Sequence, residues 1–380
     1  MKKLLSLLTV SVLVLALALA AAACSSDKKT TEKETGFIYS YTRDNDIEGY
    51  HGYATVKKYV LDDEHLEYLE KGNYTDHLID VTVPGEVVYK GNKYKVKEIG
   101  DSAFANQVLF KSVVIPSSVE KIGSGCLAGC VNLESLTVPF AGNTVNAKNE
   151  KKTLGYLFGT ASVSGTVSVS ARYNSGDSSN STTFYVPASL KTVNYTGDAI
   201  GEYAFSGLKV NTINIEKNVT EIPEGAFYGV NGIQEINLPA TVTKIGNYAF
   251  KNSYIYRVNF NELTALTSIG KEAFSGCTNL GYSANYTLAL PATVSSLGKS
   301  AFAGCEKLVN VDLSATAVTE IPENAFYSNA KLASVKLPAG VTLAKAAFVG
   351  CEELKKENVL VGGTAIATAP AGVFDEGFFN

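Results

Sequence analysis

The chain has 380 residues and 46% of them are hydrophobic, which is too apolar for a disordered protein. Its formal net charge is −4 and no basic cluster follows the N-terminus, so nucleic acid is excluded as a partner, because phosphate binding needs clustered Lys and Arg. This length suits two or three compact domains or one elongated array of repeats.

Residues 1–23 are predicted to be a lipoprotein signal peptide. Lys2 and Lys3 precede an apolar run, and small residues then lead to Cys24. This order resembles a lipobox, which implies cleavage before Cys24 and diacylation of its thiol, although Ala21 stands where Leu is usual. A plain secretory signal and an uncleaved anchor helix are the alternatives. Two acyl chains anchor a protein stably, so we expect membrane contact through Cys24 alone.

The residues after the signal peptide divide into a tether and a cap. Residues 24–35 are polar and charged, and we expect a flexible tether. Residues 36–80 are rich in Tyr and lack the repeat described below, so we expect a β-rich N-terminal cap over the first open sheet edge. The cap holds all three histidines, whose spacings match no compact metal-ligand motif: His51, His65 and His77. We therefore expect no metal, cofactor or catalytic residue, and keep a metal-dependent enzyme built on these histidines as an alternative.

From about residue 81 to residue 376, a phrase of the form Ile-Gly-x-x-Ala-Phe recurs. Its phenylalanines include Phe205, Phe227, Phe250, Phe274 and Phe302, which are 22, 23, 24 and 28 residues apart. A second phrase, apolar-x-x-apolar-x-apolar-Pro, lies between them, and its alternation predicts a short half-buried strand that proline ends. One such unit buries too few side chains to fold alone, so about ten units are expected to stack.

The combined motif Ile-Gly-x-x-Ala-Phe-x-Gly-Cys-x-x-Leu resembles the BspA-type (Treponema pallidum-type) leucine-rich repeat family, and residues 274–280 and 302–308 match it closely. The resemblance implies an α/β solenoid, a right-handed superhelix with short parallel strands on a concave face and helical or 3-10 turns on the convex face. Glycines such as Gly246 and Gly270 are expected to permit the tight turn before Ala-Phe. The family comprises surface proteins of host-associated bacteria and some protists, and some members adhere to host matrix proteins.

Two further features interrupt or accompany the repeats. Near residues 140–190, an alternating segment at 166–170 and a strand-like segment at 184–187 predict a projecting hairpin or a long polar loop, which either carries binding or is a tolerated insertion. Residues 377–380 form a short tail.

Five cysteines follow Cys24, and four of them share the Gly-Cys position of the repeat. Cys126 instead takes the Ala position. Disulfides between Cys126 and Cys130 or between Cys277 and Cys305 are conceivable, but neighbouring repeats usually splay beyond the Cα separation of about 7 Å that a disulfide allows. We expect buried, reduced thiols that act as small hydrophobic residues.

The outward positions of the strand phrase offer candidate ligand contacts. One row consists of four asparagines on successive strands: Asn194, Asn214, Asn237 and Asn259. A flanking row consists of Thr192, Thr212, Glu235 and Arg257. Stacked amides suit a glycan or an extended peptide, whereas the alternative is an Asn ladder that only stabilises the sheet. Three nearby tyrosines are expected either to stack on a ligand or to pack between repeats: Tyr254, Tyr256 and Tyr282.

Together these features predict a monomeric, non-catalytic adhesion module, lipid-anchored at the bacterial cell surface. Its expected partner is a host or environmental protein or glycan, such as a matrix protein or a mucin. An envelope scaffold that contacts other bacterial surface proteins is the second hypothesis.

Overall fold

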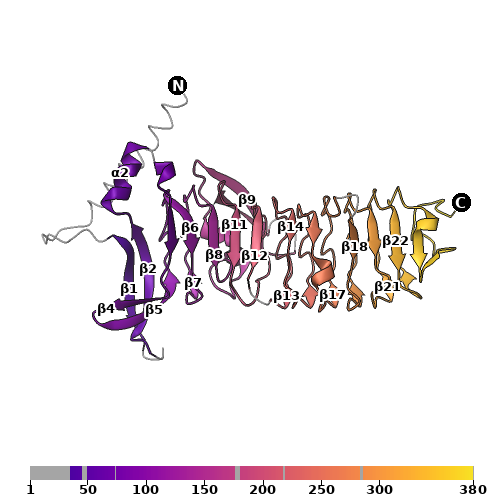
Figure 1. Cartoon of the computed structure of the whole chain (residues 1–380), viewed down its shortest axis with the longest axis horizontal. Coiled ribbons are helices and arrows are strands. Elements are labelled where there is room, and N and C mark those ends of the chain that lie inside the picture. The colour runs from indigo at the N-terminus through magenta and orange to yellow at the C-terminus, as the bar shows by residue number, and fades with distance from the viewer. Residues whose placement is uncertain are drawn as a thin grey trace, which may run out of the picture.

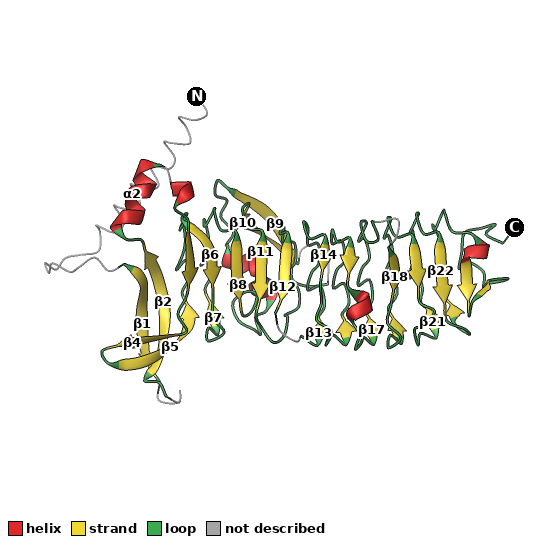
Figure 2. Cartoon of the chain, in the orientation of Figure 1, coloured by secondary structure: helices red, strands yellow, loops and turns green. Residues whose placement is uncertain are grey.

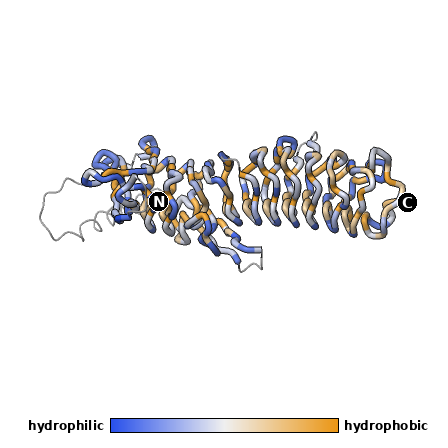
Figure 3. The backbone as a smooth tube through the Cα atoms, turned by 90° about the horizontal axis from the view of Figure 1, so that it is seen from below, coloured by the Kyte–Doolittle hydropathy of each residue, from blue (hydrophilic) through white to orange (hydrophobic). Residues whose placement is uncertain are grey.

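The computed structural model describes residues 35–44, 49–72, 74–175, 180–216, 219–282 and 286–379. The predicted signal peptide, Cys24 and the tether up to residue 34 lie outside the described residues. Figures 1 and 3 show an elongated and nearly straight rod with the N-terminal sheet at one end, so the face that carries the strands is almost flat along its length, where a concave face was expected. No helix in the described ranges is long and apolar enough to cross a membrane.

The strand phrase forms a parallel ladder along one side of the rod, in three sheets that follow one another (Figure 1). The first sheet contains β3 (Ile79–Thr82), β6 (Phe110–Val114), β8 (Ser135–Val138), β11 (Thr192–Tyr195) and β12 (Thr212–Ile215). The second contains β14 (Glu235–Ile236) and β16 (Arg257–Val258). The third contains β18 (Thr287–Ala289), β20 (Asn310–Asp312), β22 (Ser334–Leu337), β24 (Val359–Val361) and the antiparallel β25 (Thr364–Ala365). We call the outward side of this ladder the strand face.

A second parallel ladder is formed by the Ile of the Ile-Gly phrase and the residue before it. In it β5 (Asn92–Ile99) pairs with β7 (Lys121–Ile122), and β13 (Glu221–Ile222), β15 (Lys244–Ile245), β17 (Ser268–Ile269) and β19 (Ser296–Leu297) form one sheet. The last pair is β21 (Glu320–Ile321) with β23 (Thr342–Leu343). This ladder is not expected from the sequence, because a two-residue strand has no measurable alternation.

The phenylalanines of the repeat form one interior column, as the stacking of repeats requires. The ring centroids of Phe227 and Phe250 lie 4.8 Å apart and those of Phe250 and Phe274 lie 5.0 Å apart, with the rings within 5° of parallel. The amide of Phe227 donates to the carbonyl of Ala249 one repeat later, at 2.7 Å. Each repeat is therefore hydrogen-bonded to the next at three places: at the strand face, at the second ladder and at the turn that carries the phenylalanine.

Most of the turns that carry the repeat phenylalanines are not helical, although helical or 3-10 turns were expected there. Segments such as 247–252 are successive turns, and the exception is the 3-10 helix η3 (Leu154–Leu157) in one weak copy of the repeat (Figure 2). Alternate amides of these turns, such as those of Tyr248 and Phe250, bond to the next repeat, and the amides between them bond three residues back, so the α-helical bonding pattern is not formed. Other 3-10 helices are η1 (Tyr74–Asp76), η2 (Asn149–Lys152), η4 (Phe260–Glu262) and η5 (Lys356–Asn358).

The role predicted for the repeat glycines is wrong. Gly246 and Gly270 do not have a positive φ, whereas Tyr248 and Glu272, two residues later, take the left-handed conformation with φ of 56° and 53°. Glycine is required because adjacent repeats approach closely: a Cβ on Gly270 would lie 2.6 Å from the backbone nitrogen of Asn247. The small residue thus permits the packing of repeats, not the turn within one repeat.

The N-terminal region is a sheet with the strand order β1 (Gly36–Arg43), β2 (Gly52–Val60), β5 and β4 (Glu86–Tyr89). Two of its strands, β4 and β5, lie after residue 80, where the cap was expected to end, and β5 also pairs with β7 of the array. The range 36–80 also holds an unexpected helix, α2 (Asp63–Lys71), and Asp62 caps it by accepting from the His65 amide at 2.9 Å. The Phe37 ring lies 6.0 Å from that of Phe104, so this sheet packs against the first repeat.

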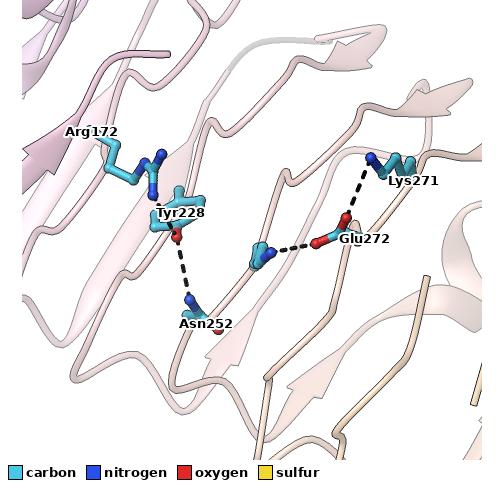
Figure 4. A network of polar contacts seen from close by, with 6 residues as sticks. Arg172, Tyr228, Asn252, Lys271 and Glu272 are labelled. Carbon is cyan, nitrogen blue, oxygen red and sulfur yellow. Dashed lines mark hydrogen bonds and ion pairs between the residues drawn. The ribbon is translucent and has the colours of Figure 1, made fainter. Parts of the chain in front are cut away.

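The insertion forms an antiparallel hairpin of β9 (Thr166–Arg172) and β10 (Ser181–Pro187). Its inward residues, among them Val169 and Phe184, are buried against the array. The Arg172 guanidinium lies 5.1 Å from the centre of the Tyr228 ring, and the Tyr228 hydroxyl accepts from the Nδ2 of Asn252 at 3.3 Å (Figure 4). One face of the hairpin is therefore fixed to the repeats.

The prediction of buried, reduced thiols is confirmed for the five described cysteines. Four of them donate from Sγ to the carbonyl oxygen of the phenylalanine one repeat earlier: Cys130, Cys277, Cys305 and Cys351. Ser253 occupies the same position and donates to the Phe227 carbonyl. The position thus selects a small side chain with a hydrogen to donate.

We expect these thiols to resist alkylation in the folded protein. Burial raises the pKa of Cys277 to about 12, so at about pH 8 only about one thiol in ten thousand is ionised. Iodoacetamide labelling followed by mass spectrometry should modify Cys277 only after denaturation, and a Cys277→Ser variant should fold as the parent does. Rapid labelling of Cys277 in native protein would contradict this burial.

Candidate ligand-binding site

The first part of the predicted asparagine row forms a ladder that satisfies itself. Asn194 and Asn214 are register partners, and the Nδ2 of Asn214 donates to the Oδ1 of Asn194 at 2.8 Å. The Nδ2 of Asn194 donates in turn to the hydroxyl of Thr137 at 3.3 Å. The flanking Thr192 and Thr212 are likewise register partners. These amides bond to one another and support the sheet, as the alternative reading of the row expects.

Asn259 is not a strand-face contact, which corrects the prediction. Its side chain is buried, with 6% of the residue exposed. Its Oδ1 accepts from the amide of Leu238 at 2.9 Å, and its Nδ2 donates to the carbonyl of the same residue at 3.0 Å. Because β16 ends after two residues, the Asn259 side chain makes the bonds to Leu238 that a longer strand would have made with its backbone.

The remaining three predicted residues have unused polar groups. Glu235 and Arg257 are exposed register partners on β14 and β16. Across the described part of the chain, neither their charged groups nor the amide of Asn237 has a hydrogen-bond or ion-pair partner. By contrast, Asp312 and Lys336, register partners on β20 and β22, form an ion pair at 3.3 Å. The strand face thus presents an acceptor, a donor and an amide side by side.

These three side chains line a depression of about 480 Å³. The hollow also borders Phe260, Tyr286 and Thr287. A smaller hollow of about 170 Å³ shares Glu235, Arg257 and Tyr286 with it and adds Tyr256 and Tyr282. The hollows lie where the strand ladder is interrupted, since β16 and β18 belong to different sheets. The sequence signal for this interruption is the 28-residue spacing from Phe274 to Phe302.

A row of tyrosines borders the smaller hollow. The ring centroids of Tyr254 and Tyr256 are 5.8 Å apart, and those of Tyr256 and Tyr282 are 5.5 Å apart. Tyr254 and Tyr282 are 44% and 62% exposed, whereas Tyr195 and Tyr203 are buried between repeats. We call Tyr254, Tyr256 and Tyr282 the tyrosine ridge.

Two larger hollows, of about 620 and 540 Å³, lie on either side of the loop near residues 144–149. In the first, Lys152 donates to Glu202 at 2.8 Å, which leaves Lys148 as its one charged lining residue without a partner among the described residues. The interrupted ladder instead presents unpaired groups of both charges, Glu235 and Arg257, so we place the candidate site there.

The cap histidines do not gather at one site. His65 Nδ1 lies 2.5 Å from the Asp62 carboxylate, His77 stacks on Tyr68 at 3.6 Å, and His51 lies against Tyr94. In the ranges that the structure covers, no group of three His, Cys, Asp or Glu residues is arranged to hold a metal.

Two parallel ladders joined by a phenylalanine column define a solenoid of leucine-rich repeats. The BspA-type leucine-rich repeat region matches the chain in six copies, over residues 92–149, 198–284 and 282–368, which is more than half of its length. The chain therefore belongs to the BspA-type leucine-rich repeat family. A comparison with curated proteins gave no match.

Several solved structures are similar over most of their length. A leucine-rich cell surface protein from Faecalibacterium prausnitzii A2-165 is 21% identical, with a TM-score of 0.34, 90% of this chain covered and 97% of the other. The pneumococcal vaccine antigen PcpA is 17% identical, with a TM-score of 0.37 and coverages of 90% and 85%. The T. pallidum leucine-rich repeat protein is 18% identical, with a TM-score of 0.23 and coverages of 86% and 92%. The family assignment rests on the repeats and not on these distant likenesses.

Proposed function

We propose that the chain is a non-catalytic binding protein that holds an extracellular protein or glycan on its strand face. The observation that carries this proposal is a set of three polar side chains around one hollow, Glu235, Asn237 and Arg257, that have no hydrogen-bond or ion-pair partner among the described residues. Exposed charges that do not pair with an available neighbour remain free for a ligand, and hydrogen bonds to charged groups are stronger than neutral ones. Leucine-rich repeat proteins in general bind other proteins, which fits this role.

We further propose that the protein is lipid-anchored through Cys24 and exposed at the bacterial cell surface. The apolar run before Cys24 and the polar tether after it support this location. The partner is then a host matrix protein or mucin, or, in the scaffold alternative, another bacterial surface protein. Crosslinking on intact cells distinguishes the two by the identity of the captured partner.

Binding should depend on Arg257. The full-length chain in mild detergent is tested against immobilised matrix proteins, mucins and bacterial surface extracts by surface plasmon resonance. We expect Arg257→Met to weaken the interaction about 10-fold, because a guanidinium contributes charge-assisted hydrogen bonds.

The matched control is Lys336→Met, since Lys336 lies on the same face and already pairs with Asp312. It should leave the affinity unchanged. Equal effects of the two substitutions, or no binding to any member of the panel, would contradict the proposal.

A further inference from the structure

We propose that the tyrosine ridge and the adjoining hollows form a subsite for an uncharged oligosaccharide. This inference rests on the proposed function and specifies the ligand class. It is carried by the juxtaposition of exposed aromatic rings with unpaired donors and acceptors of both charges on neighbouring strands, β14 and β16.

The ridge supplies apolar faces of the size and spacing of sugar rings. Its successive ring centroids lie 5.8 and 5.5 Å apart, with interplanar angles of 51° and 42°. One face of a sugar ring presents only C–H groups, which pack against the electron-rich face of an aromatic ring. Tyr282 contacts Tyr256 of the preceding repeat, but Tyr254 and Tyr282 remain 44% and 62% exposed, so part of each ring is available for such contacts.

The polar groups beside the ridge match hydroxyls better than they match a charged ligand. A hydroxyl both donates and accepts, and the site offers an acceptor in Glu235, a donor in Arg257 and an amide with both capacities in Asn237. The larger hollow is lined by charges of both signs, the carboxylates of Glu235 and Glu262 and the guanidinium of Arg257, so a ligand of either charge meets a repulsive group beside an attractive one. A neutral ligand rich in hydroxyls satisfies all three side chains at once.

The two hollows also fit a chain of several sugar units. They share Glu235, Arg257 and Tyr286, so they form one continuous surface with volumes of about 480 and 170 Å³. The Arg257 guanidinium lies 5.9 Å from the centre of the Tyr286 ring, which holds it between the two hollows. One sugar unit can therefore stack on the ridge while the next reaches the polar groups of the larger hollow.

The test uses the full-length chain in mild detergent on an array of neutral oligosaccharides, acidic oligosaccharides and unglycosylated peptides. Affinities of retained neutral saccharides are then measured by isothermal titration calorimetry. We expect Tyr282→Ala to weaken binding about 10-fold or more, and Tyr282→Phe, which keeps the ring, to change it less than about twofold. Tyr327→Ala is the matched control, because Tyr327 is a similarly exposed tyrosine, 43% exposed, that lines neither hollow.

Retention of neutral saccharides with this order of variants would support the proposal. Retention of acidic saccharides alone, or equal effects of Tyr282→Ala and Tyr327→Ala, would overturn it. Binding of peptides or of enzymatically deglycosylated proteins, without binding of neutral saccharides, would overturn this inference and leave the proposed function standing. A chain that retains neither saccharides nor proteins would overturn both.

Discussion

Replacing Gly298 by Ala should destabilise the array by about 3 kcal/mol or more, at the upper end of the cost of overpacking. A Cβ on Gly298 would lie 2.2 Å from the backbone nitrogen of Lys271 and 2.3 Å from the carbonyl carbon of Gly270, both in the preceding repeat. Backbone atoms cannot rotate away as a side chain can, so two repeats must separate, and their ladder hydrogen bonds must lengthen. Urea denaturation followed by circular dichroism measures this loss.

The matched control is Gly201→Ala. Gly201 has the same place in its Ile-Gly phrase, but nothing lies within 4 Å of a Cβ built there, and its φ is not in the left-handed region. We expect this substitution to be neutral or to stabilise by about 0.4–1 kcal/mol, because alanine restricts the unfolded chain. If both alanines cost the same free energy of unfolding, close approach between repeats is not what selects glycine.

Phe250→Ala should cost about 3–5 kcal/mol of stability, because it deletes a fully buried ring and leaves a cavity. The effect should extend along the rod, because the Phe250 ring stacks on Phe227 at 4.8 Å and on Phe274 at 5.0 Å, and both contacts are lost. In a repeat array, stability comes from neighbouring units, so the urea transition of this variant should broaden or divide into two steps.

Phe250→Leu is the milder comparison. Leu127 already takes the phenylalanine position in an early repeat and is fully buried there. We therefore expect a loss of less than about 1.5 kcal/mol and a single transition. A leucine variant as unstable as the alanine variant would show that ring stacking, not filled volume, holds the column.

Several parts of the fold could be predicted from the sequence because they depend on spacing within one repeat. The regular Phe positions predict the interior column, and the alternating strand phrase predicts the outward and inward residues of β11, β12 and β14. The reason for Gly246 and Gly270 could not be predicted, because it lies in the distance to the preceding repeat. The helical turns were wrongly predicted because alternate amides of the turns bond to carbonyls of the next repeat, which a single repeat does not reveal.

The candidate site, too, could be predicted only where it depends on positions within the repeat motif. The strand phrase places Glu235 and Arg257 on adjacent strands, so their proximity follows from the sequence. Asn259 has the same place in the phrase, but the strand ends before it and its side chain turns to the Leu238 backbone. The spacing of 28 residues after Phe274 signals an irregular repeat, but not which side chains that repeat leaves without partners.

The division of the strand ladder into three sheets makes the rod mechanically uneven. Backbone pairing on the strand face passes from one sheet to another between β12 and β14 and between β16 and β18. The second ladder continues across both junctions, because β13 pairs with β15 and β17 pairs with β19, and the amides of Phe227 and Phe274 still bond to Ala249 and Ala301. A pulling or bending force at these junctions would thus be borne by the second ladder and the phenylalanine side, and the strand face would open first. Such joints would let the rod bend at two places along the strand face without unfolding a repeat.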